Sequence, residues 1–258
     1  MISVRNLAKS YDDSVSYAVD DISFDVNPGE ILALVGESGC GKTTTLKMIN
    51  RLIEPTRGEI IVNDVNVLDL NPVELRRKIG YVFQEIGLFP HMTIAENIGI
   101  VPKLLGWPKS DIEDRIRELL ELTGLPSDDY SHKMPSELSG GQRQRVGVGR
   151  ALAARPEVML MDEPFGALDP ITRAGLQDEF KNLQKELDLT VIMVTHDMME
   201  ALILADRVAI MQEGKIVSIG PPNDLVSEAG NAYAEKLLDT PRQQSEKLEK
   251  ILKKGDKR

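Results

Sequence analysis

The chain has 258 residues, with 41 Asp and Glu against 31 Lys and Arg, a formal net charge of −10 and one cysteine. Its 41% apolar and 28% charged residues are typical of a folded globular chain and exclude a disordered one. The acidic balance argues against a nucleic-acid-binding protein, and one cysteine excludes a disulfide framework and a cysteine-based zinc site.

The most apolar runs are short. They lie at residues 31–35, 158–161 and 191–194, far below the roughly 20 residues that a membrane-spanning helix needs. The first residues also lack the charged and apolar regions of a signal peptide. We therefore expect a chain that stays in the cytosol and reaches a membrane only through a partner.

Strand-like runs alternate with helical patterns along the chain, which predicts a largely parallel sheet covered by helices. The three most apolar runs are continuous, as expected for strands buried on both faces. Two later runs joined at Glu213 and Gly214 predict a hairpin. The predicted strands are residues 2–4, 22–26, 31–35, 59–62, 79–83, 158–161, 191–195, 207–212 and 215–219.

A glycine-rich motif follows the first buried strand. Residues 36–43 fit G-x-x-x-x-G-K-[ST] between that strand and a helical pattern, which is the context of a phosphate-binding loop. Lys42 would neutralise the β- and γ-phosphates, and the Thr43 hydroxyl would bind Mg²⁺. The alternative is a glycine-rich turn with an unrelated lysine. The residues predicted to hold the nucleotide are Gly36, Glu37, Ser38, Gly39, Cys40, Gly41, Lys42, Thr43 and Thr44.

The stretch from about residue 90 to 155 has mostly helical patterns and few strand signals. We expect it to form a helical subdomain inserted into the α/β core. Ser110 and Glu113 have the spacing of a capping box, which predicts the start of one of its helices.

The end of this stretch contains the sequence LSGGQ, residues 138–142. Ser139 and Gln142 have capping-box spacing, so a well-capped helix start is one interpretation. That interpretation leaves Gly140 and Gly141 unexplained, because glycines weaken the first turn of a helix. A capped helix start with exposed backbone is also an anion site. Two such sites in one chain indicate a head-to-tail dimer that sandwiches two nucleotides, with Leu138 completing the second site.

Two acids end the buried strand at 158–161. Adjacent residues leave a strand on opposite faces, so Asp162 and Glu163 should have different roles. We expect Asp162 to hold Mg²⁺ and Glu163 to orient or deprotonate the water that attacks the γ-phosphate. A strand that simply leads into a polar turn is the alternative. Beyond Thr240 the composition becomes charged, and we expect residues 241–258 to form a tail, either frayed or with one amphipathic helix.

With these motifs in order, the sequence resembles the nucleotide-binding subunit of ABC transporters, whose signature is LSGGQ, over about residues 1–240. The resemblance implies an α/β fold: a P-loop NTPase core of the ABC type with a β-subdomain and an inserted helical subdomain. It also implies an ATPase with ATP and Mg²⁺ as cofactors, a homodimer with ATP at its interface, and separate transmembrane permease subunits. Such a chain would lie peripherally on the cytoplasmic face of the cell membrane.

The resemblance adds four site residues. Gln84 matches the glutamine that contacts Mg²⁺ and water near the permease, and His196 matches the histidine that contacts the γ-phosphate. Asp169 matches the last residue of the D-loop, although Asp169 before Pro170 is also a good helix N-cap. Tyr11 stands where the family places an aromatic ring that stacks on adenine, although a core position is the usual place for a tyrosine.

Residues 86–98, 101–107 and 165–173 are similar to ATPases of the branch that imports quaternary-amine osmoprotectants such as glycine betaine, carnitine and choline. In that branch a substrate-binding protein delivers the solute. Many members continue into paired regulatory CBS domains, for which the stretch after Thr240 is too short, so we expect that regulation to be absent or on another chain. The alternatives are the ATPase of another importer, for amino acids or other small solutes, a soluble non-transport ABC ATPase, and a non-enzymatic regulator.

Overall fold

The computed structural model describes residues 2–12, 16–227, 232–233, 235–237 and 239. The strands are β1 (Ile2–Lys9), β2 (Val19–Val26), β3 (Ile31–Val35), β4 (Arg57–Val62), β5 (Val65–Asn66), β6 (Ile79–Val82), β7 (Val158–Asp162), β8 (Thr190–Thr195), β9 (Arg207–Gln212) and β10 (Lys215–Gly220). The α-helices are α1 (Lys42–Ile49), α2 (Pro72–Lys78), α3 (Ile94–Leu104), α4 (Lys109–Leu122), α5 (Ser127–Tyr130), α6 (Gly140–Leu152), α7 (Pro170–Glu186), α8 (Met198–Leu204) and α9 (Pro222–Ser227). Short 3-10 helices span Val67–Asp69 and Pro135–Glu137.

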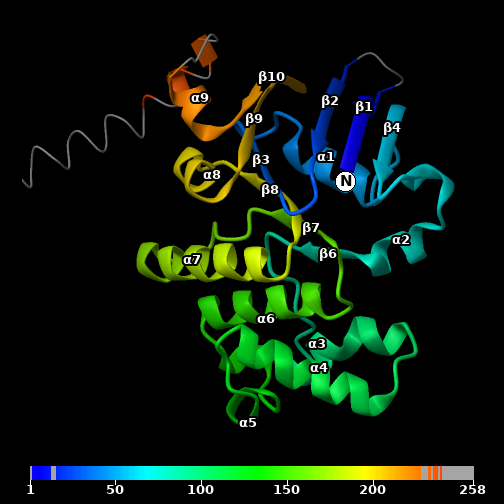
Figure 1. Ribbon diagram of the computed structural model, residues 1–258, viewed down its shortest axis with the longest axis vertical. Helices are drawn as coiled ribbons and strands as arrows, with labels where there is room; N and C mark the ends of the chain where they lie inside the picture. Colours follow the sequence, from blue (N-terminus) through cyan, green and yellow to red (C-terminus); the bar gives the residue numbers. More distant parts are fainter. Residues whose placement is uncertain (1, 13–15, 228–231, 234, 238, 240–258) are drawn as a thin grey trace, which may run out of the picture.

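The larger sheet has six strands in the order β10-β9-β3-β8-β7-β6 (Figure 1). All its pairs are parallel except β10 with β9, which form the predicted hairpin. Glu213 and Gly214 in its turn both have a positive φ, the geometry of a type I′ turn. Every residue of β3, β7 and β8 is buried, which confirms the interpretation of the three apolar runs.

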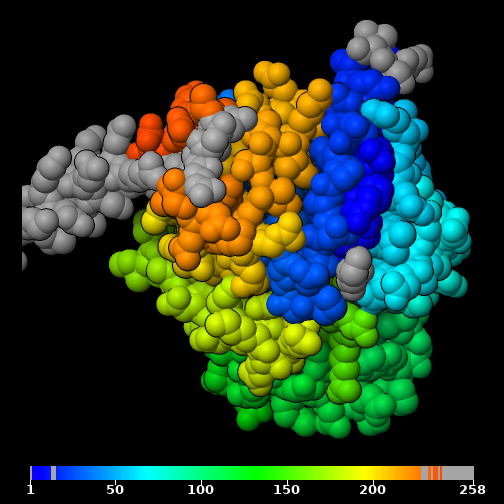
Figure 2. Space-filling view, turned by 45° about the horizontal axis from the view of Figure 1, so that its top comes forward, coloured from blue at the N-terminus to red at the C-terminus, as the bar shows by residue number. Residues whose placement is uncertain are grey.

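The smaller sheet has the order β2-β1-β4-β5 and is antiparallel. Its buried side chains share a hydrophobic core with α1 and with one face of the larger sheet, for example Ile2, Leu46 and Leu34. Figure 2 shows the smaller sheet, blue to cyan, beside the orange residues of β9 and β10. The chain therefore combines a parallel core with a β-subdomain, as the fold prediction states.

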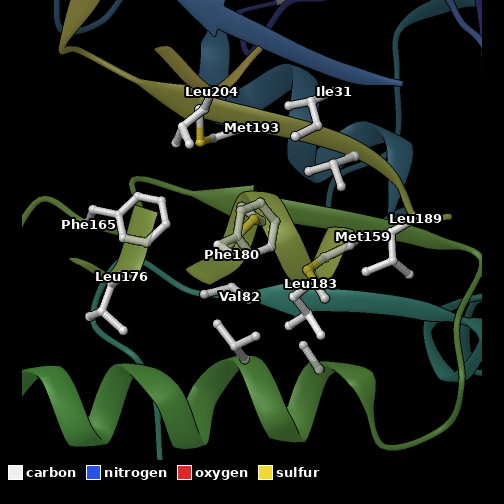
Figure 3. Close-up of a cluster of buried hydrophobic side chains, with 14 of the residues drawn as sticks. Ile31, Val82, Met159, Phe165, Leu176, Phe180, Leu183, Leu189, Met193 and Leu204 are labelled. Atoms are coloured by element: carbon white, nitrogen blue, oxygen red, sulfur yellow. The ribbon is translucent and has the colours of Figure 1, made fainter. Parts of the chain in front are cut away.

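Helices α3 to α6 follow β6 and precede β7 in the chain, and they form a layer below the sheet (Figure 1). A second core lies between this layer, α7 and the larger sheet. Figure 3 shows Phe165, Leu176, Phe180 and Leu183 facing Met159 and Met193 of the central strands. This packing ties the helical layer to β7 and β8, whose carboxyl ends carry the acid pair and His196.

One helix start was predicted wrongly. Helix α4 begins at Lys109 after Pro108, without a side-chain cap, and Ser110 lies inside it with its hydroxyl donating to Asp111. Thr93 and Glu96 instead form a capping box at the start of α3. The exact limits of the helical subdomain, 90–155, and the domain end at residue 240 remain predictions. The expected tail, residues 241–258, lies outside the described residues.

In the described part of the chain, no helix combines the length and the apolar character needed to cross a bilayer.

Candidate functional site

Four loops leave the larger sheet on the same side, at the carboxyl ends of its parallel strands. They follow β3, β6, β7 and β8, and in the parallel register Val35 is level with Thr195, and Asp162 with Val194. The carboxyl ends of parallel strands are where α/β folds bind ligands. The sheet therefore gathers the glycine-rich loop, Gln84, the acid pair and His196 at one site.

The glycine-rich loop runs between β3 and α1, as predicted. Lys42 is 5% exposed, and its Nζ donates to the carbonyl oxygens of Gly36 (2.7 Å) and Glu37 (3.0 Å). The buried ammonium thus lies against the loop's own backbone. Ser38 and Gly39 are exposed, Cys40 is buried, and Thr44 is half-buried in α1.

Two glycines of the loop are required by close contacts. A side-chain carbon at Gly36 would overlap the carbonyl oxygen of Met211 at the end of β9, and one at Gly41 would overlap that of Ala18. Gly41 also has a φ of 106°, which favours glycine. The contact with Ala18 was not predicted, because that residue lies in the segment before β2.

Asp162 is the last residue of β7 and is 5% exposed. Thr43 Oγ1 donates to Asp162 Oδ1 at 2.9 Å, which joins two of the three predicted Mg²⁺ ligands; the third, Gln84, donates to Glu163 instead. Burial raises the pKa of Asp162, although the hydrogen bond from Thr43 opposes this. Among the described residues no group of three or more His, Cys, Asp or Glu side chains could hold a metal. One carboxylate and one hydroxyl beside a phosphate loop nevertheless fit Mg²⁺, which is usually bound by few protein ligands together with substrate phosphates.

Glu163 is contacted by two other predicted site residues, Gln84 and His196. Gln84 Nε2 donates to Glu163 Oε2 at 3.2 Å, and His196 Nδ1 lies 3.1 Å from the same oxygen. Glu163 has a left-handed φ of 45°, and its backbone N–H donates to the Val194 carbonyl at 2.9 Å. Asp162 and Glu163 thus face different partners, as expected. The left-handed backbone of Glu163, which separates the two side chains, was not predicted from the sequence.

The LSGGQ segment forms the predicted capped start of α6. Gln142 N–H donates to Ser139 Oγ (3.3 Å), Ser139 N–H donates to Gln142 Oε1 (2.9 Å), and Leu138 is buried. A side-chain carbon at Gly141 would lie 2.6 Å from the Thr172 methyl group, whereas one at Gly140 would lie 3.8 Å from Leu168. Close packing against α7 therefore accounts for a glycine at position 141. The prediction that both glycines are needed for the approach of an external partner is wrong for Gly141.

Asp169 caps α7, because the N–H of Thr172 donates to its Oδ1 at 3.1 Å. Hydrogen bonds from the side chain and from the backbone N–H of Thr172 lower the pKa of Asp169. Arg173 in the next turn donates to the carbonyl of Leu168 (3.1 Å) and lies 3.5 Å from Asp197 Oδ2. Arg173 therefore connects the D-loop to the segment after His196, and this link was not predicted from the sequence.

Tyr11 lies just beyond β1 with its side chain 65% exposed, and Lys9 Nζ lies 5.1 Å from its ring centroid. An exposed ring at this position is available for stacking. The assignment of adenine to Tyr11 stays a prediction.

A groove of about 470 Å³ includes Phe83, the residue before Gln84, in its lining, which combines apolar side chains with Asn50, Arg76 and Arg77. Phe83, Phe89 and Leu104 contribute to it and are 44%, 39% and 57% exposed. Arg150 of α6 also lines the groove and donates to the carbonyls of Ile86 (2.7 Å) and Gly87 (2.6 Å). Burial lowers the pKa of this arginine. The helix that begins at LSGGQ is thus bonded to the loop that follows Gln84, a contact that was not predicted.

The profile of the ABC transporter family matches residues 19–166. The chain is 53% identical over 242 residues to the choline transport ATP-binding protein OpuBA of Bacillus subtilis, which covers 94% of the chain and 63% of the relative. It is 46% identical to the glycine betaine uptake system ATP-binding protein YehX of Escherichia coli, over 92% of the chain and 76% of the relative. The chain therefore belongs to the ABC transporter family, as an ATP-binding cassette.

Solved structures agree with this family. The dimeric, post-hydrolysis structure of the ATP-binding cassette MJ0796 bound to ADP and Pi matches with a TM-score of 0.76 and 33% identity, over 86% of this chain and 99% of that one. The cassette cbiO1 from Clostridium perfringens matches with a TM-score of 0.80 and 29% identity, over 88% and 91% of the two chains. The chain spans about three-fifths of the length of several curated relatives, including OpuBA.

Proposed function

We propose that this chain hydrolyses ATP to power the import of a small solute through a separate membrane permease. The observation that carries the proposal is the convergence of Gln84 and His196 on one oxygen of Glu163, beside the phosphate loop and the Asp162–Thr43 pair. A phosphate cradle with a carboxylate held by two polar side chains suits phosphoryl transfer to water.

The residues divide the chemistry between them. Lys42 and the loop amides bind the phosphates, and Lys42 exchanges its contacts with Gly36 and Glu37 for phosphate oxygens. Glu163 accepts a proton from the attacking water, and Gln84 and His196 keep its carboxylate oriented. Thr43 and Asp162 hold Mg²⁺, which when bound neutralises charge on the β- and γ-phosphates.

The second phosphate-binding helix start supports a homodimer. Helix α1 packs against β7 and β8, whereas α6 packs against α3, β6 and α7, so the two helix starts belong to different layers of one chain (Figure 1). In the proposed dimer each nucleotide lies between Lys42 of one copy and residues 138–142 of the other. ATP binding closes the pair and hydrolysis reopens it, because the closed state holds ATP more tightly. Asp169, next to the signature segment, would lie at the same interface.

The groove that includes Phe83 supports a contact with the permease. Exposed apolar patches rimmed by polar residues mark interaction sites, and Phe83, Phe89 and Leu104 form such a patch. Part of its lining comes from the stretches that resemble the osmoprotectant branch. From such a contact we infer a peripheral position on the cytoplasmic face of the membrane.

An osmoprotectant such as glycine betaine, carnitine or choline is the solute that the relatives favour. OpuBA and YehX are named for choline transport and glycine betaine uptake. A substrate-binding protein would deliver the solute to the permease. Import of an amino acid or another small solute is the second candidate, because the cassette itself does not touch the cargo.

A phosphate-release assay with purified chain, ATP and Mg²⁺ tests whether the chain hydrolyses ATP. A nucleotide titration measures the affinity for ATP. Lys42→Ala should weaken ATP binding at least about tenfold, the size expected when one charge-assisted contact is lost. Lys109→Ala, at an exposed lysine at the start of α4, is the matched control and should change affinity less than about threefold. Unchanged affinity in Lys42→Ala would contradict the assignment of the loop.

A further inference from the structure

The last described segment of the chain touches the phosphate loop. The backbone N–H of Glu37 donates to the Tyr233 hydroxyl at 3.0 Å, and Lys236 Nζ lies 3.7 Å from Glu37 Oε1. This segment follows α9, which packs on the outer strand β10.

The aromatic ring of Tyr233 is fixed by packing against apolar side chains. Its ring is half-buried and packs with Leu237 against the core beneath the larger sheet. Burial raises the pKa of Tyr233, so the hydroxyl stays protonated and neutral at physiological pH. A ring fixed by packing presents its hydroxyl at a defined position, at a smaller entropic cost than a flexible side chain.

The hydrogen bond between the Glu37 N–H and Tyr233 involves the same peptide unit whose carbonyl accepts from Lys42. In the Gly36–Glu37 peptide, the N–H donates to Tyr233 and the carbonyl accepts from Lys42 Nζ at 2.7 Å. Because a peptide unit is planar and its N–H and C=O point in opposite directions, fixing one fixes the other.

We propose that Tyr233 is a positioning residue for the phosphate loop. Its hydroxyl orients the Gly36–Glu37 peptide at the start of the loop, so that the loop backbone is already in place when a nucleotide arrives. The inference rests on the proposed function, because it deepens the account of nucleotide binding at that site. It also makes nucleotide affinity dependent on the C-terminal segment, so that whatever displaces this segment weakens the site.

The test uses Tyr233→Phe, which removes the hydroxyl and keeps the ring. In the nucleotide-free protein, amide hydrogen exchange of a peptide covering residues 36–41 should become faster. The affinity for both ATP and ADP should fall about threefold to tenfold, the range for one lost hydrogen bond. The kcat at saturating ATP should stay within about twofold, because a preorganising bond acts on binding.

A double-variant cycle separates this role from general packing. Glu37→Pro removes the N–H donor, so adding Tyr233→Phe to that background should cause no further loss of affinity. Lys236→Met, which removes only an exposed ion pair, should have a smaller effect than Tyr233→Phe. Equal Tm values for the wild type and Tyr233→Phe would verify that the fold is intact.

Unchanged exchange and unchanged affinity in Tyr233→Phe would overturn the inference, as would additive losses in the double variant or a lower kcat with unchanged affinity. If the wild type bound no nucleotide, the proposed function would fail. The exchange measurement would then still decide whether Tyr233 orders the loop, because it needs no nucleotide.

Discussion

The chemistry at the residue scale depends on how the Glu163 carboxylate is held. A non-glycine residue with left-handed φ costs on the order of 1–3 kcal/mol and persists only where its surroundings fix it. Here the N–H of Glu163 is bonded to the end of β8, and its Oε2 lies within hydrogen-bonding distance of Gln84 and His196. The turn thereby directs the Glu163 carboxylate away from Asp162 and toward Gln84 and His196.

Glu163→Gln should bind ATP with wild-type affinity and hydrolyse it at least about 100-fold more slowly, because the amide cannot accept the proton. Phosphate release and nucleotide titration measure the two quantities separately. Glu186→Gln, an exposed position near the end of α7, is the matched control and should keep the wild-type rate. A Glu163→Gln enzyme with more than about a tenth of the wild-type rate would remove Glu163 from the role of general base.

At the scale of elements, a buried carboxylate joins the helix after the D-loop to the helix after His196. Glu200 of α8 is 5% exposed, and Gln177 Nε2 of α7 donates to its Oε1 at 3.0 Å. Burial raises the pKa of Glu200 above the reference value of 4.5, although hydrogen bonds from Thr195 and Gln177 oppose this. The two helices are thus connected through a group whose charged form is disfavoured.

The raised pKa of Glu200 predicts the direction in which the stability of the fold changes with pH. Between pH 4.5 and the raised pKa the folded state binds more protons than the unfolded state, so stability from this group falls as pH rises through the folded pKa. Glu200→Gln does not titrate, so its Tm at pH 7 should exceed that of the wild type, on the order of 2–4 °C. The difference should shrink toward pH 4.5. A Tm difference independent of pH would contradict the assignment.

The two glycines of the signature segment should behave differently. Gly141→Ala places a carbon 2.6 Å from Thr172, so it should separate α6 from α7 and lower Tm by about 2–8 °C. Gly140→Ala meets its nearest neighbour in the chain only at 3.8 Å, so its Tm should stay within about 2 °C while its ATPase activity falls. Thermal melts and phosphate release compare the pair. Equal Tm losses in both variants would argue that Gly140 also serves internal packing.

Elements were predictable where one local signal dominated. The strands at 31–35, 158–162 and 190–195 contain the continuous apolar runs at 31–35, 158–161 and 191–194, and Glu213-Gly214 specifies the hairpin turn. The start of α4 was not predictable from Ser110, because Pro108 allows the helix to begin without a side-chain cap. Helix α2 was missed, although Asn71 and Pro72 are a standard cap and first residue.

At the scale of the whole molecule, the sequence predicted which residues lie together at the site, but not the contacts that they make. Motif order and parallel topology were enough to place the phosphate loop, Gln84, Glu163 and His196 at one edge of the sheet. The contacts of Ala18 with the loop and of Tyr233 with Glu37 join segments far apart in the chain. No local pattern encodes such contacts, because they depend on how the layers pack.

The central claim concerns two copies of the molecule, each completing the other's nucleotide site. Light scattering of Glu163→Gln, measured with and without ATP and Mg²⁺, tests it most directly. Because this variant traps the state before hydrolysis, we predict the mass of one chain without nucleotide and of two chains with ATP. A variant that binds ATP stoichiometrically and keeps the mass of one chain would contradict the account.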